Sequence, residues 1–251
     1  MDDQALIAHW QAEEQQHFEG WDFSHLKDRW HEQQPPWSYD ALVCTLLPAA
    51  DSLLDMGTGG GEKLLGFKSE LPPKTCATEG YPPNLPVAKA NLEPQGIRVI
   101  AYGCGIDDWM PFDDNSFALV INRHEAYDAL EVKRVLRPGG HFLTQQVDGN
   151  DLDDMVALFG GVSSYKHVNL GNCRHEIEQA GLVVEQTEEW AGTTTFDDIG
   201  ALVYYLHAAP WNAPEDFSVT RYTQTLLDLQ HSGRPLAFSN RRFYIQAYKP
   251  K

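Results

Sequence analysis

A glycine-rich turn after a short apolar run constrains the fold of this chain more than any other feature. Residues 53–62 read LLDMGTGGGE, so the apolar run passes through Asp55 into a cluster of glycines that ends at Gly61. This pattern is typical of a buried parallel strand that turns tightly into a helix. Glycine permits positive φ angles and close approach of a ligand to the backbone, and the start of the helix presents unpaired N–H groups. The segment therefore predicts a ligand-binding turn.

The spacing of the glycines narrows the class of ligand. A dinucleotide fingerprint requires Gly or Ala directly after Gly61, where Glu62 stands, and a P-loop requires a Lys-Ser/Thr pair that the segment lacks. What remains is the pattern D-x-G-x-G-x-G from Asp55 to Gly61. It resembles motif I of the class I S-adenosylmethionine (SAM) methyltransferases. A structural turn that binds no ligand is the alternative interpretation of this segment taken alone.

A second acid follows at the distance that such a fold requires. The expected second strand, residues 74–78, leads into Glu79, which lies 24 residues after Asp55. An acid roughly 20 residues beyond the glycine turn accepts hydrogen bonds from ribose hydroxyls in nucleotide-binding folds of this type. Glu79 is therefore the predicted ribose ligand, and a solvated loop acid is the alternative.

Two further stretches resemble one branch of these methyltransferases, the enzymes of ubiquinone and menaquinone biosynthesis. Residues 110–120 follow the pattern LPF-x-D-x-SFD-x-V of their adenine-binding loop and fourth strand, and RVLRPGG at 134–140 follows their turn into the fifth strand. The family's usual acid before the proline is Ile106 here, so the adenine contact is expected to pass to Asp107 or Asp108. Ala118 replaces the usual Asp after Phe117.

The resemblance spans residues 52–147 and implies a fold, a cofactor and a set of binding residues. The implied fold is α/β and Rossmann-like, with a seven-stranded, mostly parallel sheet, helices on both faces and an antiparallel last strand. The implied cofactor is SAM, with S-adenosyl-L-homocysteine as product. No metal is expected, because His167 and His175 have no third ligand nearby in the sequence. The implied cofactor-binding residues are Asp55, Gly57, Thr58, Gly59, Gly61, Glu79, Gly80, Asp107, Asp108, Trp109 and Asn122.

Polar residues at the ends of the fourth and fifth strands are the candidate acceptor site. Ligands of open α/β sheets bind beyond the carboxyl ends of the strands, which places residues 122–125 and 144–146 there. His124 is the candidate general base, and Arg123 is a candidate for orienting an anionic group of the acceptor. Alternatively, these polar residues cap the following helix and serve the structure alone.

The composition of the chain limits which binding partners and which cellular compartment are expected. The net charge of −17 disfavours a polyanionic nucleic acid, whereas it tolerates the cationic sulfonium of SAM. No apolar run is long enough to span a membrane, and the acidic, polar N-terminus differs from a secretory signal. Four cysteines without paired spacing are expected to be free thiols in a reducing cytoplasm.

We expect residues 1–48 to form an N-terminal helical lid or cap and residues 49–251 to form the SAM-binding domain, with a helical insertion around 191–238. Trp37 and Tyr39 are candidate walls of the ligand site or, equally, anchors of the N-terminal helix. The predicted function is SAM-dependent methyl transfer to O or N of a small molecule. The alternatives are methylation of an RNA base and SAM binding without catalysis.

Overall fold

The computed structural model describes residues 1–18, 23–106 and 109–251. The described residues form one eight-stranded sheet with the order β1-β7-β8-β6-β5-β2-β3-β4. The strands are β1 (Trp30–Glu32), β2 (Ser52–Met56), β3 (Lys74–Glu79), β4 (Arg98–Ala101), β5 (Phe117–Arg123), β6 (Leu136–Val147), β7 (Val183–Phe196) and β8 (Leu236–Tyr248). None of the described helices is long and apolar enough to cross a membrane.

The centre of the sheet has the predicted parallel arrangement. β2 pairs in parallel with β3 and β5, β3 pairs with β4, and β5 pairs with β6, whereas β8 runs antiparallel to β6. The Rossmann-like class and the antiparallel last strand are therefore confirmed. The predicted number of seven strands was wrong, because β1 adds an eighth strand antiparallel to the end of β7. β1 is only three residues long, too short for the alternation of apolar and polar residues that reveals a strand.

The chain divides into two compact units, each with its own core. We call the first, Met1–Pro35, Asp148–His167 and Trp190–Arg241, the aromatic unit. The second, Pro36–Val147, Val168–Glu189 and Arg242–Lys251, is called the motif unit because it contains the glycine turn. The chain first passes from one unit to the other after Pro35, which lies inside the segment 1–48 that was expected to form a lid or cap. That this segment acts as a lid stays a prediction.

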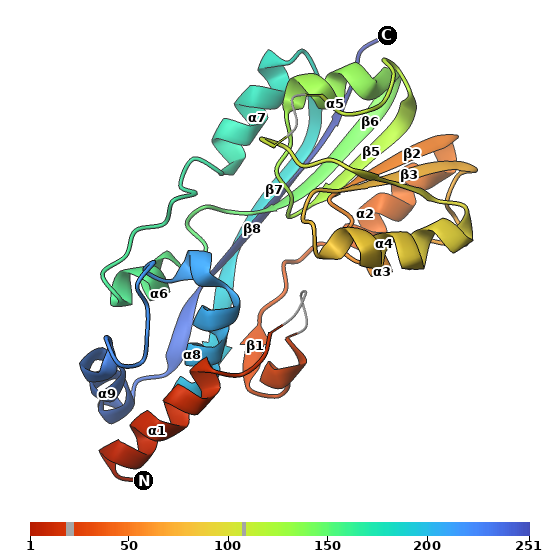
Figure 1. Cartoon of the computed structure of the whole chain (residues 1–251). Helices are drawn as coiled ribbons and strands as arrows, with labels where there is room; N and C mark the ends of the chain where they lie inside the picture. The colour runs from red at the N-terminus through yellow and green to blue at the C-terminus, as the bar shows by residue number, and fades with distance from the viewer. Residues whose placement is uncertain (19–22, 107–108) are drawn as a thin grey trace. The chain divides into compact units, whose positions relative to one another are not determined.

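In the motif unit, helices cover both faces of the sheet (Figure 1). Successive side chains of a strand point to opposite faces, so Val120 joins one buried cluster and its neighbours Leu119 and Ile121 join another. α5 (Ala129–Val135) and α7 (Leu170–Gln179) pack on the first cluster. α2 (Tyr39–Leu46), α3 (Glu62–Leu65) and α4 (Asn84–Leu92) pack on the second. The result is the doubly wound architecture that the sequence predicts.

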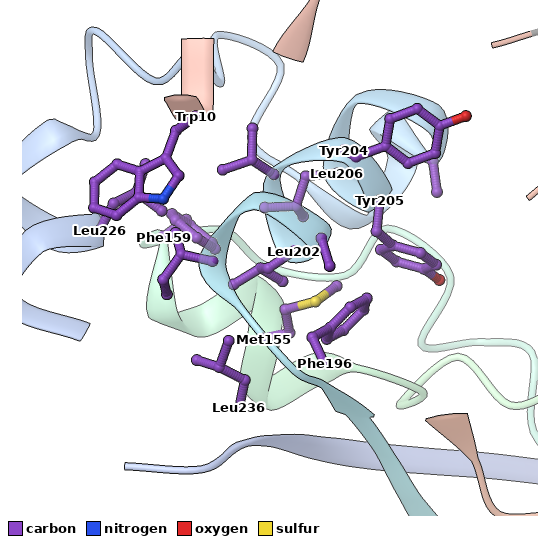
Figure 2. Packing of buried hydrophobic residues seen from close by; sticks show 14 of the residues in the cluster. Trp10, Met155, Phe159, Phe196, Leu202, Tyr204, Tyr205, Leu206, Leu226 and Leu236 are labelled. Carbon is purple, nitrogen blue, oxygen red and sulfur yellow. The ribbon is translucent and has the colours of Figure 1, made fainter. Parts of the chain in front are cut away.

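The aromatic unit is assembled around α8 (Ile199–Ala208), nearly all of whose residues are buried. Figure 2 shows Trp10 of α1 (Asp3–Glu14), Phe159, Leu202 and Leu226 within one apolar cluster. α6 (Asp153–Leu158) and α9 (Thr223–Ser232) complete the helices of this unit. A helix that is apolar on every side requires such enclosure, because no face of it can be left in water.

Buried charge in the aromatic unit is neutralised. Glu13 is 6% exposed and accepts hydrogen bonds from His25 at 2.7 Å and from Arg29 at 2.9 Å. Arg29 also binds both carboxylate oxygens of Asp198, the residue that caps α8. Although burial alone raises the pKa of Glu13, the hydrogen bonds from His25 and Arg29 hold it below its usual value. Arg29 therefore joins the start of α8 to α1.

Candidate functional site

The glycine turn connects the end of β2 to α3, as its sequence predicts. Gly57, Gly59 and Gly61 have φ angles of +68°, +63° and +88°, which side chains other than glycine rarely adopt. The backbone N–H of Thr58 donates to the carbonyl of Thr78 at 2.9 Å, which fastens the turn to β3. Gly61 is the N-cap residue of α3.

The three glycines are required for different reasons. A Cβ atom at Gly57 would overlap the side chain of Glu125, and one at Gly61 would overlap Leu92. A Cβ atom at Gly59 would meet no protein atom within 4 Å. Gly59 is therefore the position where the turn is open, and the backbone there is accessible to a ligand.

Glu79 lies beside this open position. Its carboxylate accepts hydrogen bonds from the N–H of Gly59 at 2.7 Å and from the N–H of Tyr81 at 2.6 Å. Gly80 follows directly, where a Cβ atom would approach the Cα of Gly103 to 2.6 Å, so close packing of two chain segments alone explains that glycine. The fold thus brings the two strongest sequence motifs, the turn and the acid, into contact.

The acids around the turn are not neutralised by cations. Among the described residues, Asp55, Glu79 and Glu125 form no ion pair at the salt-bridge distance of 4 Å. Burial, reinforced by the charge of Glu79, raises the pKa of Asp55 to about 7. The same two causes raise the pKa of Glu125, which the sequence did not single out as a cofactor residue. The electrostatic potential at the turn favours a cationic ligand.

The predicted adenine loop is held by an arginine that sequence reasoning missed. Arg134 donates to the carbonyls of Met110 at 2.8 Å and Phe112 at 2.6 Å, and it pairs with Glu131. Trp109 is 68% exposed and lies over the guanidinium of Arg134, at the edge of a surface hollow of about 420 Å³. Asp107 and Asp108 lie outside the described residues. Arg134 belongs to the RVLRPGG motif, which was the available signal.

At the end of β5, Asn122 and Arg123 have contrasting environments. Asn122 is fully buried, and its carbonyl oxygen accepts hydrogen bonds from Thr144 and Gln146. Arg123 is exposed, and its guanidinium lies 6.0 Å from the ring centroid of Tyr39. The hydroxyl of Tyr39 is buried and has no hydrogen-bond partner among the described residues.

His124 has an unusual backbone and a defined set of contacts. Its φ angle is +59°, and its N–H donates to the carbonyl of Gln145 at 2.8 Å. The Nε2 atom of its ring lies 3.1 Å from the side-chain amide nitrogen of Gln145, whose oxygen accepts from the indole N–H of Trp37 at 2.8 Å. Desolvation by the surrounding protein, with the charges of Arg123 and Arg242, lowers the pKa of His124 well below its usual value. This shift favours the neutral imidazole.

Comparison with known proteins covers this part of the chain. The family model described as a methyltransferase domain matches residues 54–144, from β2 into β6. The uncharacterized methyltransferase YcgJ of Bacillus subtilis is 23% identical over 225 residues, which cover 80% of this chain and 85% of YcgJ. The residues that the family model matches include the glycine turn, Glu79 and the end of β5.

Solved structures share the fold. A crystal structure of a proposed methyltransferase from Bacillus halodurans has a TM-score of 0.60 and 21% identity, covering 86% of this chain and 100% of that protein. The crystal structure of YcgJ has a TM-score of 0.58 and 18% identity, covering 85% of this chain and 100% of YcgJ.

Proposed function

We propose that the protein, whose residues 54–144 match a model described as a methyltransferase domain, transfers the methyl group of SAM to an oxygen or nitrogen atom of a small molecule. The observation that carries the proposal is the hydrogen bond between Glu79 and the open glycine, Gly59. It joins a ribose-binding acid to a turn that accepts a ligand against its backbone.

The residues of the turn fit SAM. Glu79 would receive the ribose hydroxyls, and the backbone from Gly57 to Gly61 would lie against the ligand. The unpaired acids Asp55 and Glu125 complement the positive charge of the sulfonium, which supplies the electrophilic methyl group when SAM is bound. Thr58, Gly80 and Asn122 complete the proposed cofactor site, and the resemblance assigns the adenine to Asp107, Asp108 and Trp109.

Arg123 and His124 are the proposed acceptor-facing residues. Transfer of a methyl group in line requires alignment of the nucleophile and exclusion of water more than it requires acid–base chemistry. Arg123 carries a charge at the carboxyl end of β5, beside the motif I turn, where it would orient an anionic group of the acceptor.

Charge supports a small acceptor over RNA. The chain carries 36 Asp and Glu against 19 Lys and Arg, and a protein that binds RNA normally presents a basic surface to the phosphates. We propose a cytoplasmic location, where cysteines without disulfide bonds are usual.

The test uses SAM with an isotopically labelled methyl group and two acceptor pools, a small-molecule extract and total RNA. We expect label in the small-molecule pool and submicromolar to micromolar binding of SAM by calorimetry. Label that enters RNA in a salt-sensitive manner would instead support the RNA alternative. Tight SAM binding without transfer to either pool would support a non-catalytic protein.

A further inference from the structure

A chain of two hydrogen bonds connects Trp37, Gln145 and His124 inside the motif unit. The indole N–H of Trp37 donates to the Oε1 atom of Gln145 at 2.8 Å, and the Nε2 atom of Gln145 lies 3.1 Å from the Nε2 atom of His124. Gln145 is only 5% exposed, so water does not replace these contacts freely. The residues come from the segment before α2, from β6 and from the end of β5.

The chemistry of the indole fixes the direction of both bonds. Trp37 can only donate, so the amide atom of Gln145 that faces it must be the oxygen. The amide NH₂ then faces His124, and because it can only donate, the Nε2 atom of the imidazole must accept. A neutral imidazole that accepts at Nε2 carries its proton on Nδ1.

The surroundings of His124 also disfavour the doubly protonated imidazolium. An imidazolium would direct a second N–H group at the amide NH₂, and Arg123 and Arg242 add positive charge nearby. The charges of Arg123 and Arg242 lower the pKa of His124 in the same direction as desolvation. The backbone bond from His124 to the carbonyl of Gln145 holds the residue at its φ of +59° and keeps the ring beside the amide.

We infer that Trp37 and Gln145 fix His124 as the neutral Nδ1–H tautomer, so that His124 is a hydrogen-bond donor to the methyl acceptor and not its general base. Among the described residues, Nδ1 has no protein partner, and His124 keeps solvent-exposed surface although protein atoms around it desolvate the ring. A donor at this position selects acceptors that present a free lone pair, such as a phenolate, enolate or carboxylate oxygen. Such an acceptor arrives deprotonated or loses its proton to solvent.

The tautomer can be measured without any acceptor or cofactor. In protein labelled with ¹⁵N-histidine, the ring nitrogen shifts of His124, assigned by comparison with His124→Gln, distinguish a protonated from an unprotonated nitrogen. We expect protonated Nδ1 and unprotonated Nε2 at neutral pH. Gln145→Glu places an acceptor beside Nε2 and should move the proton to that nitrogen.

Trp37→Phe and Trp30→Phe form a matched pair. Trp37→Phe removes the donor that orients the amide, so we expect a mixture of tautomers. Trp30→Phe removes an indole whose N–H has no partner among the described residues, in the aromatic unit, and should leave the His124 spectrum unchanged. The Nε2–H tautomer in the parent protein, or a spectrum that Trp37→Phe does not alter, would overturn the inference.

The role of the tautomer in transfer rests on the proposed function, whereas the tautomer itself does not. If the spectra match the expectation and no acceptor is ever methylated, the proposed function fails and the hydrogen-bond chain stands. If transfer is found with His124 in the other tautomer, only the inference fails.

Discussion

Glu13 of the aromatic unit and Asp55 of the motif unit are both buried acids, but only Glu13 has a cationic partner. In the aromatic unit, hydrogen bonds from His25 and Arg29 hold the pKa of Glu13 below its usual value in spite of burial. In the motif unit, Asp55 has no such cation, and burial raises its pKa to about 7. A buried acid with a cationic partner is compatible with a stable fold, whereas a buried acid without one lowers the free energy of unfolding. Such an unpaired acid is expected where ligand binding requires it. The contrast separates a structural acid from an acid of the proposed ligand-binding turn.

The largest expected effect is the loss of Arg29. Arg29→Met removes the guanidinium that Glu13 shares with Asp198 and leaves His25 as the remaining partner of the buried Glu13, so the free energy of unfolding should fall by roughly 3 to 5 kcal/mol. Arg221→Met is the control, because Arg221 and its partner Asp216 are 62% and 54% exposed. Its effect should stay below about 1 kcal/mol in urea unfolding. If the two substitutions lowered the free energy of unfolding equally, the ion pairs of Arg29 would contribute no more to stability than the exposed pair of Arg221.

The next effect concerns ligand binding at the open glycine. Gly59→Val should weaken SAM binding at least 100-fold, or about 3 kcal/mol, because the valine side chain occupies the space of the ligand. Gly96→Val is the matched control, since Gly96 has φ +81° and also has open space where a Cβ would lie. The two variants share the same backbone strain. Unchanged SAM affinity in Gly59→Val, measured by calorimetry, would refute the assignment of the turn.

Asp55 predicts a distinctive pH dependence. The pKa of Asp55 is about 7 in the folded protein, against roughly 4 in an unfolded chain, so the folded state binds the extra proton between these values. Its contribution to stability therefore falls as pH rises from about 4 to 7. Asp55→Asn should be more stable than the parent by roughly 1 to 4 kcal/mol above pH 7, and by little near pH 4.

The same group should make SAM binding depend on pH. A cationic ligand favours the ionised form of Asp55, so the affinity for SAM should rise as pH increases through 7, and Asp55→Asn should bind SAM more weakly without this rise. Thermal unfolding and calorimetry at pH 5, 6, 7 and 8 measure both effects. An Asp55→Asn protein that is destabilised at pH 8 would contradict a raised pKa.

Local patterns predicted the motif unit well. The glycine turn and the strand before Glu79 depend on residues close in sequence, and both were found in place. The turn expected at RVLRPGG, between a helix and the fifth strand, was wrong in its position. β6 begins at Leu136, directly after α5, so the proline and glycines of that motif fall within the strand. The reason is pairing of Leu136 with Phe117, which only the fold reveals.

Contacts between residues far apart in the chain could not be predicted from the sequence. The bond from Trp37 to Gln145 joins residues 108 positions apart, and the aromatic unit gathers three separate segments around α8. Nothing in the periodicity of α1 shows that Trp10 packs near Leu226, because periodicity identifies a buried face and not its partner. The identity of His124 as a candidate was readable, whereas its protonation depends on this tertiary network.

The smallest expected effect separates two roles of His124 in the motif unit. A donor is replaced in part by the amide of asparagine, so His124→Asn should retain transfer within about threefold of the parent, while His124→Ala should lose roughly five- to tenfold, the value of one hydrogen bond. A general base has no substitute in asparagine, and the transfer rates of both variants would then fall together by about 10² to 10⁴.

The measurement is the transfer rate at saturating SAM, with an acceptor found in the labelling experiment. SAM affinity should stay within about twofold in both variants, since His124 is proposed to face the acceptor. A loss of 100-fold or more in both variants would show that His124 removes a proton from the acceptor. His124 would then be the general base that its position at the end of the fourth predicted strand suggests.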